Sequence, residues 1–164
     1  MVKSFIQKRV KIMQKDTSKL NEILNSTGRD ALPGFFKENN GEMLSASLSA
    51  STYIRELAAL HKMKLDDIYT RAGMSLSYGR KIASGKTVKK RDTVIRLCLA
   101  LRTSLPEANR LLKLYNMPTL YARDKRDAVL IVAFNEGLSD TNDVDSLLAE
   151  YGLAPLEKCS RDEE

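Results

Sequence analysis

The side chains of this chain that are best suited to chemistry lie in residues 75–84, where hydrogen-bonding groups stand beside an apolar one. Six of them are spaced so that one helix could present them outward: Leu76, Ser77, Tyr78, Arg80, Lys81 and Ser84. Arginine and lysine can donate to guanine O6 and N7, serine can bond either way, and leucine can contact a thymine methyl group. This set favours non-covalent readout of base edges. For Tyr78 an inward position beside Gly79 is an equal alternative.

A run of cations follows this segment. Four positive charges occur within six residues, at Lys86, Lys89, Lys90 and Arg91, and Lys64 lies upstream of the segment. Cations beside a groove-reading helix contact phosphate oxygens, which position a protein on a duplex without reading its sequence. We therefore predict phosphate contacts from these five side chains. The alternative is a solvated charge run.

The charge of the chain is distributed unevenly. The net charge is +6, yet residues 51–121 hold 14 lysines and arginines against 5 acids, and residues 122–164 hold 5 against 11. Positive charge is thus concentrated around the segment described above, as it is in proteins that bind nucleic acid. The acidic last part is a candidate surface for a protein partner.

Two short helices joined by a tight turn must position these side chains. Residues 65–72 predict the first helix, Gly73 predicts a turn with a positive φ angle, and residues 75–84 predict the second helix, closed by Gly85. Apolar side chains should hold the two helices together from within: Ile68, Ala72, Met74 and Ile82. This spacing is typical of a helix-turn-helix, which places a helix in the DNA major groove.

The rest of the sequence predicts further helices and no sheet. They are expected at residues 3–24 (one or two amphipathic helices), 52–61, 91–102, 105–115, 123–136 and 140–151, with residues 26–41 as a loop. The helix at residues 91–102 is apolar on most sides and should be buried. A capping box from Ser104 to Glu107 starts the next helix. Residues 130–132 could form a strand on propensity, but no partner strand is evident.

Several functional classes lack the residues that they need. His61 is the only histidine, and Cys98 and Cys159 are not at metal-ligand spacing, so we expect neither a metal site nor a catalytic relay. Neither a glycine-rich phosphate loop nor a paired-carboxylate site is visible, so we expect neither an enzyme nor a cofactor. An apolar run of about eighteen residues and a signal-peptide pattern are both lacking, which predicts a cytoplasmic protein without a membrane partner.

The motif resembles a known family. The run AGMSLSYGRKIASGK, followed by TVIRLCLALR and SLPEANRLL, is similar to the XRE family of Cro/C1-type helix-turn-helix regulators over about residues 52–115. A fuller pattern over about residues 20–157, closing with LLAEYGLAPL, resembles a longer subgroup with extra C-terminal helices. The resemblance implies an all-α, lambda-repressor-like helix-turn-helix domain with an N-terminal arm and additional C-terminal helices.

Four positions depart from the usual pattern of that family. Tyr69 stands where a small residue is usual, and Gly79 stands where a branched apolar residue is usual. We interpret the two as one exchange, in which the Tyr69 ring fills the space that Gly79 leaves. Leu65 replaces a glutamine that often helps to clamp a phosphate, and Ala83 replaces a frequent acid.

Residues and resemblance together predict a function and a domain organisation. We expect an arm at residues 1–50, the helix-turn-helix domain with its extension at residues 51–157, and a polar tail at residues 158–164. The predicted function is that of a repressor-like, sequence-specific DNA-binding transcriptional regulator that inserts its second helix into the major groove of double-stranded DNA. One such domain contacts few base pairs, so we expect a homodimer.

Two alternatives to this function remain open. The first is a protein–protein interaction module that reuses the fold without specific DNA binding, which the departures at Leu65, Gly79 and Ala83 favour. The acidic C-terminal helices are a separate candidate surface for a protein partner. The second is nonspecific binding of RNA or of a membrane surface by the basic residues.

Overall fold

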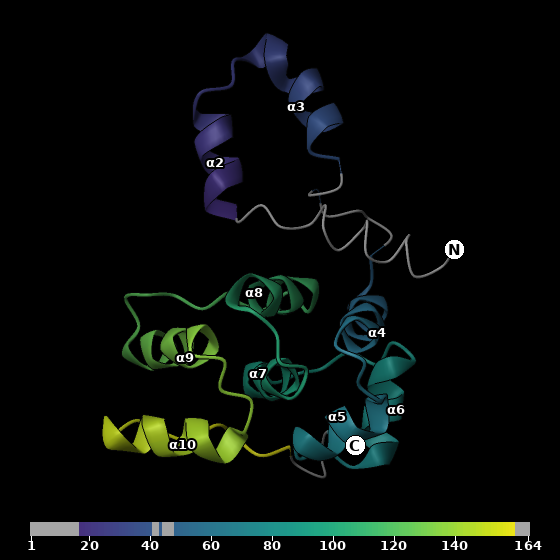
Figure 1. The fold of residues 1–164 in the computed structure, drawn as a ribbon, viewed down its shortest axis with the longest axis vertical. Coiled ribbons are helices and arrows are strands. Elements are labelled where there is room, and N and C mark those ends of the chain that lie inside the picture. Colours follow the sequence, from purple (N-terminus) through teal and green to yellow (C-terminus); the bar gives the residue numbers. More distant parts are fainter. Residues whose placement is uncertain (1–16, 41–42, 44–47, 160–164) are drawn as a thin grey trace. The chain divides into compact units, whose positions relative to one another are not determined.

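The described part of the chain is built from helices alone. The computed structural model describes residues 17–40, 43 and 48–159, and no strand occurs among them. The prediction of an all-α protein is therefore confirmed for these residues. The chain divides into two compact units, residues 1–48 and residues 49–164, and each is described by itself (Figure 1). None of the described helices is both long enough and apolar enough to cross a membrane.

The first unit contains more helix than the sequence predicted. Its elements are α2 (Thr17–Asn25), the 3-10 helix η1 (Arg29–Ala31) and α3 (Leu32–Glu38). The loop predicted at residues 26–41 is thus partly wrong, because Pro33 lies in the first turn of α3, where a missing backbone N–H costs nothing. Phe35 is buried, and the Asn39 side chain donates to its carbonyl oxygen over 2.8 Å. The part of the predicted amphipathic helices before residue 17 lies outside the described residues.

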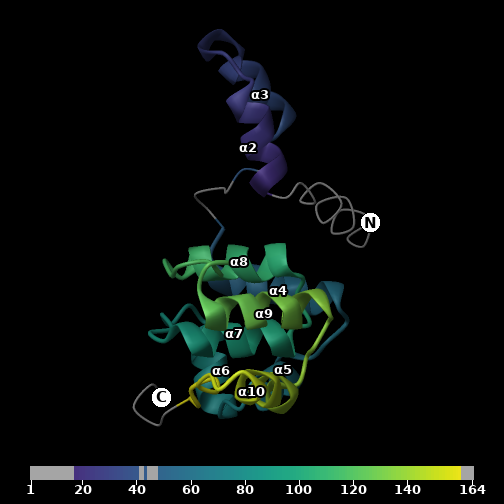
Figure 2. The same cartoon turned by 90° about the vertical axis from the view of Figure 1, so that its left-hand side faces the viewer.

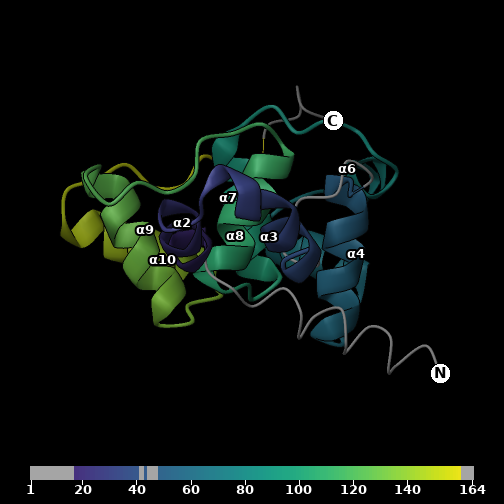
Figure 3. The ribbon, with the colours of Figure 1, turned by 90° about the horizontal axis from the view of Figure 1, so that it is seen from above.

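The second unit surrounds one central helix. Its helices are α4 (Ala50–Leu60), α5 (Leu65–Arg71), α6 (Leu76–Ala83), α7 (Arg91–Ala100), α8 (Leu105–Leu114), α9 (Lys125–Asn135) and α10 (Thr141–Glu150). Helix α7 packs on α5, α8 and α10, and its residues from Asp92 to Ala100 are all buried. This confirms the prediction of a buried helix. Figures 2 and 3 show α7 between α8 and α10, with α4 and α6 on the side opposite α9.

Short polar caps decide where several of these helices begin. The hydroxyl of Ser49 accepts from the Thr52 backbone amide and caps α4, so this helix begins slightly before the predicted residue 52. The predicted capping box is present, and the Ser104 amide donates to Glu107 over 2.8 Å. Residues 130–132 lie within α9, so the alternative of a strand there is wrong.

Candidate nucleic-acid interface

Backbone hydrogen bonds fix the angle between α5 and α6. The amide of Gly73 donates to the Thr70 carbonyl over 3.0 Å, and the amide of Met74 donates to the Tyr69 carbonyl over 2.9 Å. This closure needs a left-handed residue at its centre, and Gly73 has a φ angle of +75°. Ser75 then caps α6 by accepting from the Tyr78 amide over 3.1 Å. Both the turn glycine and the closing Gly85, at φ +105°, stand where the sequence predicted.

The two helices of this pair approach closely at one point. Tyr69 is fully buried, and its ring lies against Gly79. A Cβ atom added to Gly79 would lie 2.7 Å from Cδ1 of Tyr69 and closer still to Cγ and Cδ2. No side chain larger than hydrogen fits there without moving the ring. The prediction that the Tyr69 ring fills the space left by Gly79 is confirmed.

Helix α6 presents a polar outer face over an apolar inner one. Ile82, Tyr78 and Gly79 are buried, while the opposite face is exposed at Leu76, Ser77, Arg80, Lys81 and Ser84. Its C-terminus is held by the Arg55 guanidinium of α4, which donates to the Ala83 carbonyl over 2.6 Å. The helix is therefore supported from behind and solvated in front.

One predicted contact residue faces inward instead. Tyr78 is 1% exposed, so of the two positions considered for it the structure has the inward one, and its ring cannot reach a base edge from there. The Nζ atom of Lys86 lies 4.8 Å from the centre of this ring, at a distance suited to a cation–π contact. Tyr78 therefore supports Lys86 rather than reading a groove.

The predicted phosphate contacts divide into two groups. Lys64, which precedes α5, and Lys89, in the loop after α6, are exposed. Lys86 and Lys90 are half-buried, and Nζ of Lys90 lies 3.4 Å from the Glu157 carboxylate. None of these four lysines is fully buried, so all four stay candidates for phosphate contacts.

Arg91 corrects the prediction, because its guanidinium is engaged inside the fold. It makes a two-point ion pair with Asp127 at 2.8 and 2.7 Å and also donates to the carbonyls of Pro118 and Thr119. The side chain is 25% exposed and ties the start of α7 to α9. A phosphate contact would require this ion pair to open, so Arg91 is removed from the set.

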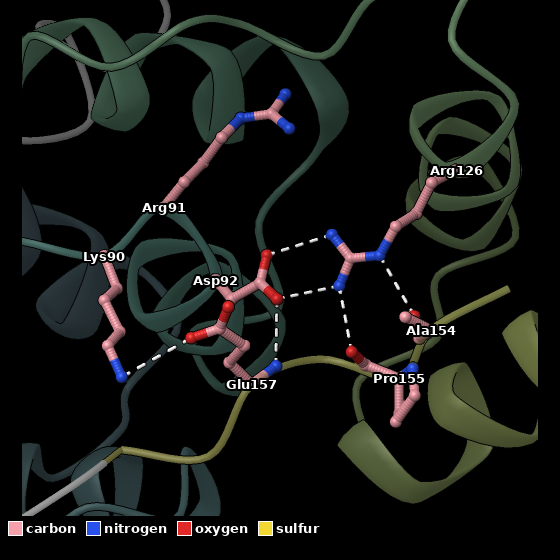
Figure 4. A pocket seen from close by; sticks show the side chains of 7 residues that line it. All are labelled: Lys90, Arg91, Asp92, Arg126, Ala154, Pro155 and Glu157. Atoms are coloured by element: carbon pink, nitrogen blue, oxygen red, sulfur yellow. Dashed lines mark hydrogen bonds and ion pairs between the residues drawn. The ribbon is translucent and has the colours of Figure 1, made fainter.

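A second ion pair, next to that of Arg91 with Asp127, binds the last described residues to the helices. Arg126 of α9 forms a two-point ion pair with Asp92 of α7 at 3.0 and 2.7 Å and donates to the carbonyls of Ala154 and Pro155 (Figure 4). The Glu157 amide donates to the same Asp92 carboxylate over 2.9 Å. We call the extended segment of residues 153–159 the C-terminal strap.

Arg96 links this strap to the turn before α6. Its buried guanidinium donates to the carbonyls of Glu157 and Leu156 over 2.9 and 3.3 Å. It also donates to the Ala72 carbonyl at the end of α5 over 3.4 Å. This role could not be predicted from the sequence, where a single arginine in the apolar run VIRLCLAL is the only signal for it.

The ion pairs change the acidity of their carboxylates. Burial alone would raise the pKa of Asp92, but the hydrogen bonds from Arg126 and from the Glu157 amide outweigh it and leave this pKa below its ordinary value. The same holds for Asp127. Burial would raise its pKa, but the hydrogen bonds from Arg91 and from the Tyr121 amide outweigh burial and hold this pKa below its ordinary value. Both carboxylates are therefore charged at neutral pH.

A cavity of about 330 Å³ lies next to these ion pairs. Its lining residues are Lys90, Arg91, Asp92, Arg126, Ala154, Pro155 and Glu157 (Figure 4). The charged groups among them bond to one another or, for Arg91, to Asp127. The cavity thus belongs to the ion-pair network that holds the strap.

Comparisons of the chain with protein-family models, with curated proteins and with solved structures found no match.

Proposed function

We propose that this chain is a sequence-specific DNA-binding transcriptional regulator of the XRE type. In this proposal residues 49–159 form a lambda-repressor-like helix-turn-helix domain, and α6 enters the major groove of double-stranded DNA. The resemblance of the sequence over about residues 52–115 supports this assignment.

One observation carries the proposal. Helix α6 combines a buried apolar back with an exposed front that contains Ser77, Arg80 and Lys81. A recognition helix needs this combination, since its back must be rigidly held while its front loses water to base edges. Leu76, 39% exposed at the first position of the helix, suits contact with a thymine methyl group.

Along the chain, the predicted phosphate contacts stand before α5 and after α6. Lys64 lies before α5, while Lys86, Lys89 and Lys90 lie in the loop after α6. Contacts with phosphates fix the register of a helix along a groove without reading sequence. Because one domain of this size reads few base pairs, we further propose that the chain binds as a homodimer.

A second candidate function is supported by two acids on the same surface. Asp66 and Asp67 lie exposed in the first turn of α5, where a negative charge opposes a nearby phosphate. They favour a protein–protein interaction module that uses the α5–α6 surface for a basic partner. For the chain to bind DNA, the attraction of the lysines and Arg80 around α6 to the phosphates must exceed the repulsion from these two carboxylates.

Binding of the full chain to a pool of random duplexes decides between these functions. DNA recognition predicts a selected consensus, with affinity falling by about 0.9 log units per log of salt for each phosphate contacted. Lys89→Glu with Lys90→Glu should weaken binding to every duplex alike, whereas Arg80→Ala should relax preference at one base pair. Lack of binding at low salt would favour the interaction module, and tight binding without a consensus would favour nonspecific attachment.

A further inference from the structure

The guanidinium of Arg80 is held by a carboxylate from the other helix of the pair. Its Nη2 atom lies 3.0 Å from Oδ2 of Asp66, in the first turn of α5. Both side chains are exposed, at 67% and 50%. An ion pair this exposed contributes less than about 1 kcal/mol to folding, so stability does not account for its position on the outer face.

The pair restricts what Arg80 can recognise. A guanidinium carries five N–H donors in a rigid planar fork, and Asp66 accepts from one of them. The remaining donors can meet two acceptors side by side, as guanine presents at O6 and N7. A fork already fixed by Asp66 loses less conformational freedom when it docks, so it discriminates better between bases.

We propose that Asp66 is a positioning residue that determines specificity by orienting Arg80 toward guanine. This inference rests on the proposed DNA-binding function. Asp66 carries the same charge as the phosphates and so lowers the affinity for every duplex. Its signature is therefore a gain in base preference accompanied by a loss in overall affinity, which a merely structural acid would not produce.

Asp67 provides a matched control on the same helix. It is exposed, carries the same charge and shares the favourable position of Asp66 in the first turn of α5. No ion pair of Asp67 with Arg80 occurs among the described residues, where Arg80 pairs with Asp66. Any effect of charge or of the helix dipole should therefore be equal in the two variants.

The test measures dissociation constants of the full chain for its selected duplex and for the versions changed at the base pair that Arg80→Ala relaxes. For Asp66→Ala we expect the preference for guanine to fall about threefold, which is part of the roughly tenfold loss expected for Arg80→Ala, because Arg80 keeps its donors and loses only its fixed orientation. Asp67→Ala should leave this preference unchanged. Both variants should raise the affinity for random duplexes at low salt to a similar extent.

Two further variants keep the inference testable if Asp66→Ala folds poorly by circular dichroism. Asp66→Glu keeps the charge but displaces the fork, and it should lose the same preference. In an Arg80→Lys background, which lacks the fork, Asp66→Ala should add no further loss. If the guanine preference survives in both Asp66 variants, the inference about Asp66 is wrong and the proposed DNA-binding function still stands. If the native chain selects no consensus, both the proposed function and this inference are wrong.

Discussion

The aromatic ring of Tyr69 occupies the place where any side chain at position 79 would begin. This contact lets α5 and α6 approach closely, while the backbone hydrogen bonds of the turn fix the angle between them. Gly79 costs a helix interior about 1 kcal/mol relative to alanine, so the close approach explains a residue that helix propensity disfavours.

Substitution of Gly79 should destabilise the fold in spite of the better helix propensity. We expect Gly79→Ala to cost about 2 kcal/mol and Gly79→Ile more, because the added atoms overlap the Tyr69 ring. Thermal unfolding followed by circular dichroism measures the effect. Gly34→Ala, at a helical glycine of α3 whose added Cβ meets nothing within 4 Å, is the control. A stabilised Gly79→Ile variant would show that the exchange with Tyr69 is not what constrains this position.

Removal of one oxygen from the same ring should have the opposite effect. The hydroxyl of Tyr69 is buried and has no hydrogen-bond partner among the described residues, and burial raises its pKa. Tyr69→Phe removes an unsatisfied polar atom while keeping the ring against Gly79. We expect it to raise the unfolding free energy by about 1 kcal/mol. A clear loss of stability in urea titrations would indicate that the hydroxyl is satisfied after all.

The ion pairs of α7 and α9 should make the fold sensitive to acid. The pKa values of Asp92 and Asp127 lie below their ordinary value in the folded chain, so protons bind these carboxylates more tightly after unfolding. Their contribution is present above about pH 4, the ordinary pKa of aspartate, and is lost as the pH falls through the lower folded values.

A variant isolates this contribution. Asp92→Asn should lower the unfolding free energy at pH 7 by about 2 kcal/mol and flatten its fall below pH 4, since Arg126 then lacks its charged partner. Denaturant titrations between pH 2 and pH 7 would follow both effects. Asp143→Asn, at an exposed residue of α10, tests for general charge effects and should leave the pH dependence nearly unchanged. Equal pH curves for native and Asp92→Asn chains would refute the assignment.

Glu157 should weaken DNA binding by neutralising Lys90. The two charges lie 3.4 Å apart and both side chains remain partly exposed. Glu157→Gln removes the negative charge beside Lys90 and keeps the backbone of the strap, so we expect all duplexes to bind about threefold more tightly at low salt. Fluorescence anisotropy would measure this gain. Glu150→Gln, on the exposed end of α10, removes the same charge and should give a smaller effect.

The sequence predicted the local features of this fold well. Gly73, Gly85 and the capping box are set by backbone geometry that only certain residues satisfy, so their positions could be read directly. Helix α3 was missed because Pro33 and Gly34 resemble loop residues unless the helix start is known.

The partners of charged residues could not be predicted in the same way. Arg91 looked like one more cation of the run after α6, and nothing near it in the sequence singles out Asp127 as its partner. The two stand 36 residues apart, and only the packing of α9 on the rest of the fold brings them together. Pairings over such distances depend on tertiary structure, which charge patterns along the sequence do not encode.

Arg96 has a consequence for the modularity of this protein. Arg96 is 5% exposed, and its guanidinium depends on carbonyl groups that lie 60 and 61 residues further along the chain. A fragment excised after α8 would leave a cation in the apolar interior with most of its acceptors gone. The helices that follow α8 are thus no optional appendage. They supply hydrogen-bond acceptors for the buried Arg96 guanidinium. We therefore expect that a fragment containing only α4 to α8 cannot fold alone.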